Sequence, residues 1–212
     1  MVFLSLSHSR LNVFINKLVD YSNSDRVDNQ YKNELQRNNL RYYLMNMDLI
    51  HPSILFVGEA PGYQGCAITG VPFTSESIVM SHKNSSVLNG CICLGNQKEP
   101  TATMIWGILD EKEREKKLVK MPLMWNIFPF HPIDNGCIKT NRKPNDDECE
   151  FGYNILNELL TFFPYIEEIY AVGKTAEKIL VNHKHPKYKS SLRHPSNGGK
   201  QMFKSGIDII YP

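Results

Sequence analysis

The stretch Ile54-Leu55-Phe56-Val57 is a short, uninterrupted apolar run that ends at Gly58. A continuous run of this length is typical of a strand buried on both faces of a parallel sheet. Similar runs follow at 123–128, 169–172 and 207–211, and a weaker candidate lies at 190–193. We therefore expect a central, mainly parallel four-stranded sheet.

Helical patterns separate these runs, at 101–119, 146–163 and 175–181. Strands that alternate with helices predict right-handed crossovers and a three-layer α/β/α sandwich. Two more helices are predicted before the first strand, within 1–20 and 31–47, and we expect this leading segment, 1–50, to pack on the rest. A chain of 212 residues is long enough for one compact domain and too short for two ordinary ones, which predicts a single domain over 1–212.

Cysteine usage and hydropathy restrict the class of protein. The five cysteines include no C-x-x-C pair, so we expect reduced thiols and no metal site. The run Cys91-Ile92-Cys93 lacks the second ligand pair that a zinc site needs. At the amino end the apolar residues precede the charges, unlike in a signal peptide, and no stretch is long enough to cross a bilayer. These features predict a monomeric cytoplasmic protein without a membrane partner.

Basic residues are concentrated near the carboxyl end. The segment 178–207 carries seven Lys or Arg residues and no Asp or Glu, which leaves 17 basic against 22 acidic residues elsewhere. Most charge runs are solvated surface, but this one contains the Gly-rich loop described below. The segment therefore favours a polyanionic partner.

Three loops follow predicted strands, at the sheet edge where α/β folds bind ligands. The first is Gly58-Glu59-Ala60-Pro61-Gly62, which lacks the spacing of a phosphate-binding loop. The second begins at Asn126, a polar residue in an apolar strand end whose amide either bonds nearby backbone or reads the edge of a base. The third is His194-Pro195-Ser196, inside the basic segment.

These loops, in this order, resemble the uracil-DNA glycosylase superfamily over about 54–203. The first resembles the G-E-x-P-G motif of its bacterial and archaeal branch, together with the downstream Gly70-Val71-Pro72-Phe73, and His194-Pro195-Ser196 resembles the second superfamily motif. The resemblance implies an enzyme that flips uracil, or another damaged base, out of DNA and hydrolyses its N-glycosidic bond as the first step of base excision repair.

The resemblance also implies roles for individual residues. Phe73 is the platform on which the flipped base stacks, Asn126 reads its O4 and N3–H edge, and His194 donates to O2 as negative charge develops there. Core packing is the alternative interpretation for Phe73. The expected base-binding residues are completed by Gly58, Ala60 and Tyr63. The loop 197–202 takes the place of the minor-groove wedge. The expected DNA contacts are Ser196 and, within this loop, Asn197, Gly198, Gly199 and Lys200.

Two departures from the family pattern change these expectations. Ala60 occupies the position of the Asp that orients water in the most active relatives, which implies slower chemistry and leaves Glu59 as the nearest catalytic carboxylate. Relatives with this motif often bind a four-iron cluster through four cysteines, two of them before the first strand, but this chain has no cysteine before Cys66. We therefore expect no cofactor.

Several alternatives remain open. The chain is compatible with a catalytically weak or inactive DNA-binding homologue, or with a glycosylase for hypoxanthine, xanthine or mismatched thymine. A small-molecule hydrolase with His194 and Glu59 as acid and base is a third interpretation, which explains neither the basic segment nor Phe73. The polar insertion 81–98 is compatible with a substrate lid or a disordered surface loop.

Overall fold

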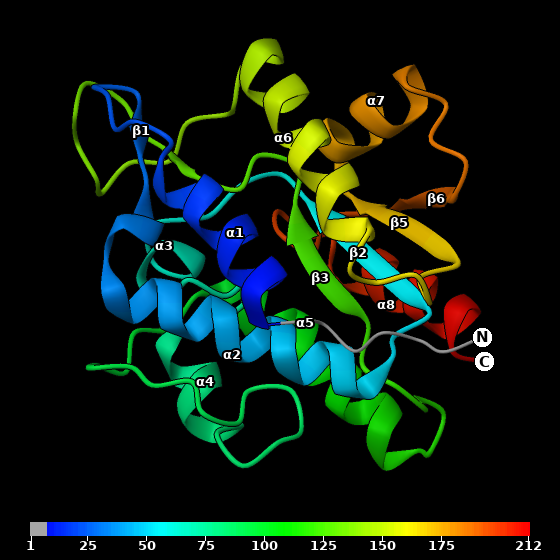
Figure 1. Ribbon diagram of the computed structural model, residues 1–212. Coiled ribbons are helices and arrows are strands. Elements are labelled where there is room, and N and C mark those ends of the chain that lie inside the picture. The colour runs from blue at the N-terminus through cyan, green and yellow to red at the C-terminus, as the bar shows by residue number, and fades with distance from the viewer. Residues whose placement is uncertain (1–7) are drawn as a thin grey trace.

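The computed structural model describes residues 8–212, and its centre is a sheet of four parallel strands (Figure 1). The strands are β2 (Ile54–Gly58), β3 (Leu123–Asn126), β5 (Glu168–Val172) and β6 (Tyr188–Leu192), in the spatial order β3-β2-β5-β6. β2 pairs in parallel with β3 on one side and with β5 on the other. All of β2 beyond Ile54 is buried, as the apolar run predicts.

Helices cover both faces of the sheet. On one side lie α1 (His8–Val19), α6 (Asp146–Leu160) and α7 (Lys174–Asn182), and on the other α5 (Pro100–Arg114) and α8 (Lys200–Ile210) (Figure 1). The three-layer α/β/α prediction is confirmed. The predicted first helix starts within the described residues at His8, and its expected beginning at 1–7 lies outside them. Within residues 8–212 no helix has the length and apolar character needed to cross a membrane.

Helix α2 (Glu34–Ile50) follows the outer edge of β3. The Tyr43 hydroxyl accepts a hydrogen bond from the Met124 amide at 2.8 Å and lies 3.3 Å from the Met124 carbonyl, to which it donates. These contacts satisfy groups that an edge strand would otherwise expose. One hydrophobic core contains buried residues of α1, α2 and the strands, so the leading helices share the core of the sheet.

Short elements complete the chain. β1 (Val27–Asp28) and β4 (His131–Pro132) form an antiparallel ribbon, and the 3-10 helix η1 (Gln30–Lys32), α3 (Cys66–Thr69) and α4 (Glu76–Ser81) lie in connections. The ribbon joins the loop before α2 to the loop after β3.

The prediction of a strand at 207–211 is wrong, because this run belongs to α8. Phe203 and Ile207, four residues apart, are fully buried, whereas Ile209 is 81% exposed, which is the pattern of an amphipathic helix. A short apolar run cannot be assigned to helix or strand by periodicity alone. The fourth strand is β6, which overlaps the weaker candidate at 190–193.

The insertion 81–98 is folded onto α2 and α4. The Asn39 side chain donates to the Ile92 carbonyl at 2.7 Å and accepts from the Ile92 amide at 2.9 Å. The Glu76 carboxylate accepts from the amides of Gly95 and Gln97, at 2.7 and 3.0 Å. The segment is therefore a packed part of the structure, in place of the lid or disordered loop that its composition suggested.

Candidate active site

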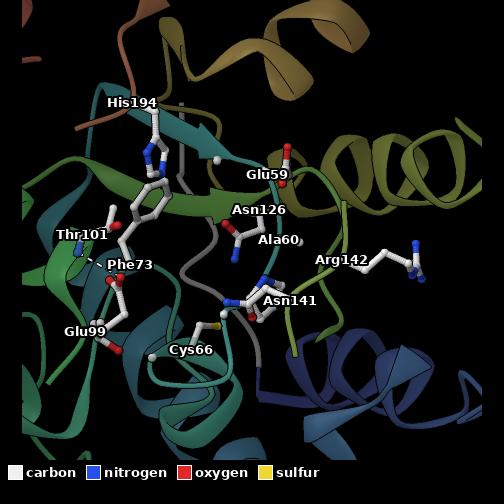
Figure 2. A pocket seen from close by; sticks show the side chains of 15 residues that line it. Glu59, Ala60, Cys66, Phe73, Glu99, Thr101, Asn126, Asn141, Arg142 and His194 are labelled. Atoms are coloured by element: carbon white, nitrogen blue, oxygen red, sulfur yellow. Dashed lines mark hydrogen bonds between the residues drawn. The ribbon is translucent and has the colours of Figure 1, made fainter. Parts of the chain in front are cut away.

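A cavity of about 220 Å³ opens at the carboxyl ends of β2 and β3 (Figure 2). Its lining brings together Phe73, Asn126 and His194, which are far apart in the sequence. The cavity is smaller than the pockets of about 300–1,000 Å³ that take drug-sized ligands, which suits a ligand no larger than a single base. The other lining residues are Gly58, Glu59, Ala60, Pro61, Gly62, Gly65, Cys66, Thr74, Glu99, Thr101, Asn141 and Arg142.

Gly58 allows the Phe73 ring and the Asn126 amide to meet at the end of β2. Gly58 lies opposite Asn126 in the register of β2 and β3. A Cβ at position 58 would lie 2.5 Å from Cζ of Phe73 and 2.8 Å from Oδ1 of Asn126. The Phe73 backbone has a left-handed φ of 56°, and its carbonyl accepts from the Trp106 indole at 2.9 Å. The position of the ring therefore depends on a glycine, on a strained backbone and on a buried tryptophan.

The Asn126 side chain is only 5% exposed, yet its amide has no hydrogen-bond partner among residues 8–212. The side chain is buried, but its amide atoms stay in contact with the open cavity. The amide points into the cavity (Figure 2), where a ligand would satisfy it. The alternative interpretation, an amide satisfied by neighbouring backbone, does not hold in this structure.

The imidazole of His194 is held in one tautomer. Its Nδ1 accepts from the Ser196 backbone amide at 3.2 Å and lies 2.7 Å from the Ser196 hydroxyl oxygen. Burial lowers the pKa of His194, although the charges of Glu99 and Glu59 act in the opposite direction. The neutral ring therefore carries its proton on Nε2, which has no partner in the described part of the chain.

Two carboxylates line the cavity, and both already accept hydrogen bonds. Glu59 accepts from the Thr175 hydroxyl, at the start of α7. Glu99 is the N-cap of α5, and its oxygens accept from the amides of Thr101 and Ala102. Ala60 contributes only a methyl group to the cavity lining. The cavity therefore has negative charge nearby but no carboxylate at position 60.

Sequence reasoning missed several lining residues, among them Glu99 and Asn141. Glu99 precedes Pro100, and a capping residue before a proline at the first helical position is a recognisable helix start. Asn141 carries no local signal. Tyr63, which was expected at the base, is absent from the cavity lining, and its backbone amide instead donates to Asn141 Oδ1 at 3.0 Å.

The expected DNA loop leads from His194 into α8. Asn197 and Gly198 have left-handed φ values of 50° and 76°, and a Cβ on Gly199 would lie 2.0 Å from the His194 carbonyl. Only glycine fits position 199, so this loop folds tightly against the histidine. Lys200 starts α8 and is exposed, as is Met202, at 64%.

A second cavity of about 330 Å³ adjoins the first and shares Glu59 and His194 with it. Three of its lining residues are cationic, Lys143, Lys174 and Arg193, and Ser196 also lines it. Within the basic segment 178–207, Lys178, Lys189 and Lys204 form ion pairs with acidic residues. Three cations therefore lie beside the site, and one of them, Arg193, belongs to the basic segment.

The side chains do not fit an iron–sulfur cluster. The chain has no cysteine before Cys66, and across residues 8–212 no three His, Cys, Asp or Glu side chains converge in a way that would hold a metal. Cys66, Cys91 and Cys149 are buried, and burial raises the pKa of each thiol. The absence of a cofactor stays a prediction.

Comparison with known proteins decides the family. The sequence model of the uracil DNA glycosylase superfamily matches residues 45–207, which include the whole cavity lining. The chain belongs to the uracil-DNA glycosylase superfamily.

A solved structure shows the same architecture. The crystal structure of wild-type Pedobacter heparinus SMUG2 is similar to this chain with a TM-score of 0.66 and 18% sequence identity, over 95% of this chain and 96% of that one. At this identity the likeness shows the shared fold. No curated protein matches this chain. Membership supports a DNA glycosylase, a hydrolase of N-glycosidic bonds.

Proposed function

We propose that this superfamily member is a uracil-DNA glycosylase that removes deaminated cytosine from DNA as the first step of base excision repair. The observation that supports this proposal is the convergence of the Phe73 ring, the Asn126 amide and the His194 imidazole on one base-sized cavity. Extruding a base costs a few kcal/mol, and stacking plus hydrogen bonds in the cavity offset that cost.

Asn126 supplies the selectivity for uracil in this mechanism. Its Nδ2 donates to O4, and its Oδ1 accepts from N3–H. Cytosine presents an amino group and an unprotonated N3 at the same places, so both hydrogen bonds would be mismatched. The absence of any protein partner for this amide in the described chain is what makes it available.

His194 stabilises the leaving base. The C1′–N1 bond breaks with its electron pair going to the base, so that negative charge develops at O2 while the sugar becomes cationic. The neutral imidazole donates its Nε2–H to O2, and this hydrogen bond strengthens as the charge grows. Burial keeps the ring neutral by lowering the pKa of His194.

Glu59 completes the hydrolysis. Water adds its oxygen to the cationic C1′, and the proton released passes to solvent or through water to Glu59. The Glu59 carboxylate also favours the sugar cation electrostatically. Because Ala60 provides no carboxylate and Glu59 is bonded to Thr175, this step is slower than in relatives with an acidic residue at that position.

Ala60 also favours a second candidate function, a homologue that binds damaged DNA without releasing the base. The two candidates differ in product. Oligonucleotides containing uracil in single strands, in U:G pairs and in U:A pairs are incubated with the wild type and with His194→Ala, and abasic sites are scored. We expect abasic product from the wild type and little from the variant. DNA binding without abasic product from all three substrates would favour the second candidate.

A further inference from the structure

Asn141 presents a second amide to the cavity. The residue lies in the loop before α6, and its Oδ1 accepts from the Tyr63 backbone amide at 3.0 Å. That bond fixes which end of the amide is oxygen, because the backbone N–H can only donate. Both hydrogens of Nδ2 remain without a partner in the described chain. Figure 2 shows the side chains of Asn141 and Asn126 directed toward the same space.

The support behind Asn141 is rigid, although Asn141 itself is exposed. The adjacent Arg142 side chain is 8% exposed and makes a two-pronged ion pair with Glu148, at 2.7 and 2.8 Å. Its guanidinium also donates to the carbonyls of Arg26 and Ile133. Glu148 in turn closes the capping box of α6. These bonds hold the backbone next to Asn141 in place. The short Asn141 side chain then loses little conformational freedom when it binds a ligand.

Only small groups of the cavity wall lie beside this amide. The position of a Cβ on Gly62 would lie 3.8 Å from Oδ1 and 3.9 Å from Nδ2 of Asn141, so the Gly62 backbone passes close beside it. The adjoining wall is the methyl group of Ala60. A bulky residue at position 62 would stand between the amide and the cavity.

We propose that Asn141 is a second base-reading residue, which donates from Nδ2 to a carbonyl oxygen of the flipped base. This inference rests on the proposed function and adds a specificity determinant to it. Asn126 offers both a donor and an acceptor, whereas Asn141, with its oxygen turned to the Tyr63 amide, presents the donors of its Nδ2 to the cavity (Figure 2). An amino group facing it would bring two donors together, so Asn141 selects bases in which deamination has replaced an amino group by a carbonyl.

Asn141→Asp is the discriminating variant. An aspartate oxygen still accepts from the Tyr63 amide, so the structural bond is kept and only the donors are lost. Affinity is measured for DNA containing 2′-fluoro-deoxyuridine, which resists cleavage, for the matching 2′-fluoro-deoxycytidine DNA, and for DNA with a tetrahydrofuran abasic analogue. The abasic analogue corrects for the added negative charge, and thermal unfolding checks the fold.

We expect Asn141→Asp to lower the preference for the uracil analogue over the abasic analogue by about tenfold, as for the loss of one hydrogen bond to a buried acceptor. The preference over the cytosine analogue should fall as well. Unchanged preferences, or no preference in the wild type, would overturn the inference. Uracil release by the wild type with unchanged preferences in the variant would leave the proposed function standing. Lost preference without any base release would support the inference and reject the function.

Discussion

The ring of Phe73 occupies the space that a side chain at position 58 would need. A Cβ on Gly58 would lie 2.5 Å from Cζ of Phe73 and only 2.8 Å from the Asn126 amide oxygen. The strand that the sequence identifies as buried therefore ends in a residue whose lack of a side chain lets the Phe73 ring and the Asn126 amide line the cavity together. The positions of both Phe73 and Asn126 therefore depend on the absence of a Cβ at Gly58.

Gly58→Ala should displace the ring, the amide or both. A displacement of about 1 Å at a reacting site costs about 100-fold in rate, and we expect a loss of at least that size in uracil release. Gly107→Ala is the matched control, because nothing lies within 4 Å of a Cβ there and alanine favours the helix. Equal rates for the wild type and Gly58→Ala in single-turnover assays would contradict this account of the site.

The decline of kcat/KM at acidic pH should reflect the protonation of His194. Burial holds its pKa below 6.5, so the neutral, donating form persists at least down to that pH. We expect kcat/KM to decline only below pH 6.5, as protonation removes the Nδ1 acceptor of the Ser196 amide. The activity that remains in His194→Gln should not show this decline at acidic pH. A decline that begins well above pH 6.5 in the wild type would show that the imidazolium form is not excluded by burial.

The same lowered pKa affects stability. Below pH 6.5 the unfolded chain binds a proton at His194 that the folded chain still rejects, so the contribution of this group to the free energy of unfolding falls as the pH falls toward the folded pKa. Denaturant titrations of the wild type and His194→Gln at several pH values would measure the difference.

Substitution of the two cavity carboxylates should affect different properties, the reaction rate for Glu59 and the stability for Glu99. Glu59→Gln keeps an acceptor for Thr175 and loses only the charge, so we expect a loss of about 100-fold in the chemical step with little change in DNA binding. Glu99→Gln weakens the cap of α5 and should lower the free energy of unfolding by about 1 kcal/mol with a small effect on rate. A larger rate loss for Glu99→Gln than for Glu59→Gln would reassign the catalytic carboxylate.

Two lysines of α8 should differ in their contribution to DNA binding. Lys204 is held by Glu111 at 2.5 Å, whereas Lys200 is exposed and has no ion-pair partner in residues 8–212. We expect Lys200→Ala to reduce the slope of log affinity against log salt by about 1, as for one lost phosphate contact. Lys204→Ala should change it less. Equal salt slopes for both variants and the wild type would show that the bound DNA does not contact this part of α8.

Much of this site could be predicted because its signals are local. The apolar run of β2, the glycines after it and the His194 motif each lie within a few consecutive residues, and the parallel sheet brings strand ends to one edge. Asn141 could not be found in this way, since its bond to Tyr63 joins residues 78 positions apart. The strand prediction for 207–211 fails for another reason, because a helix with one buried face resembles a buried strand over a short length.

Uracil release by the wild type and by Asn126→Leu tests the central claim most directly. The leucine keeps the branched shape of the asparagine and breaks no hydrogen bond within the described protein, so the fold should be retained. We predict abasic product from uracil-containing DNA with the wild type. With Asn126→Leu the rate of uracil release should fall by at least about 100-fold, because no side chain at position 126 then forms hydrogen bonds with the base edge. Equal rates for the two proteins, or no product from the wild type on any uracil substrate, would contradict the account.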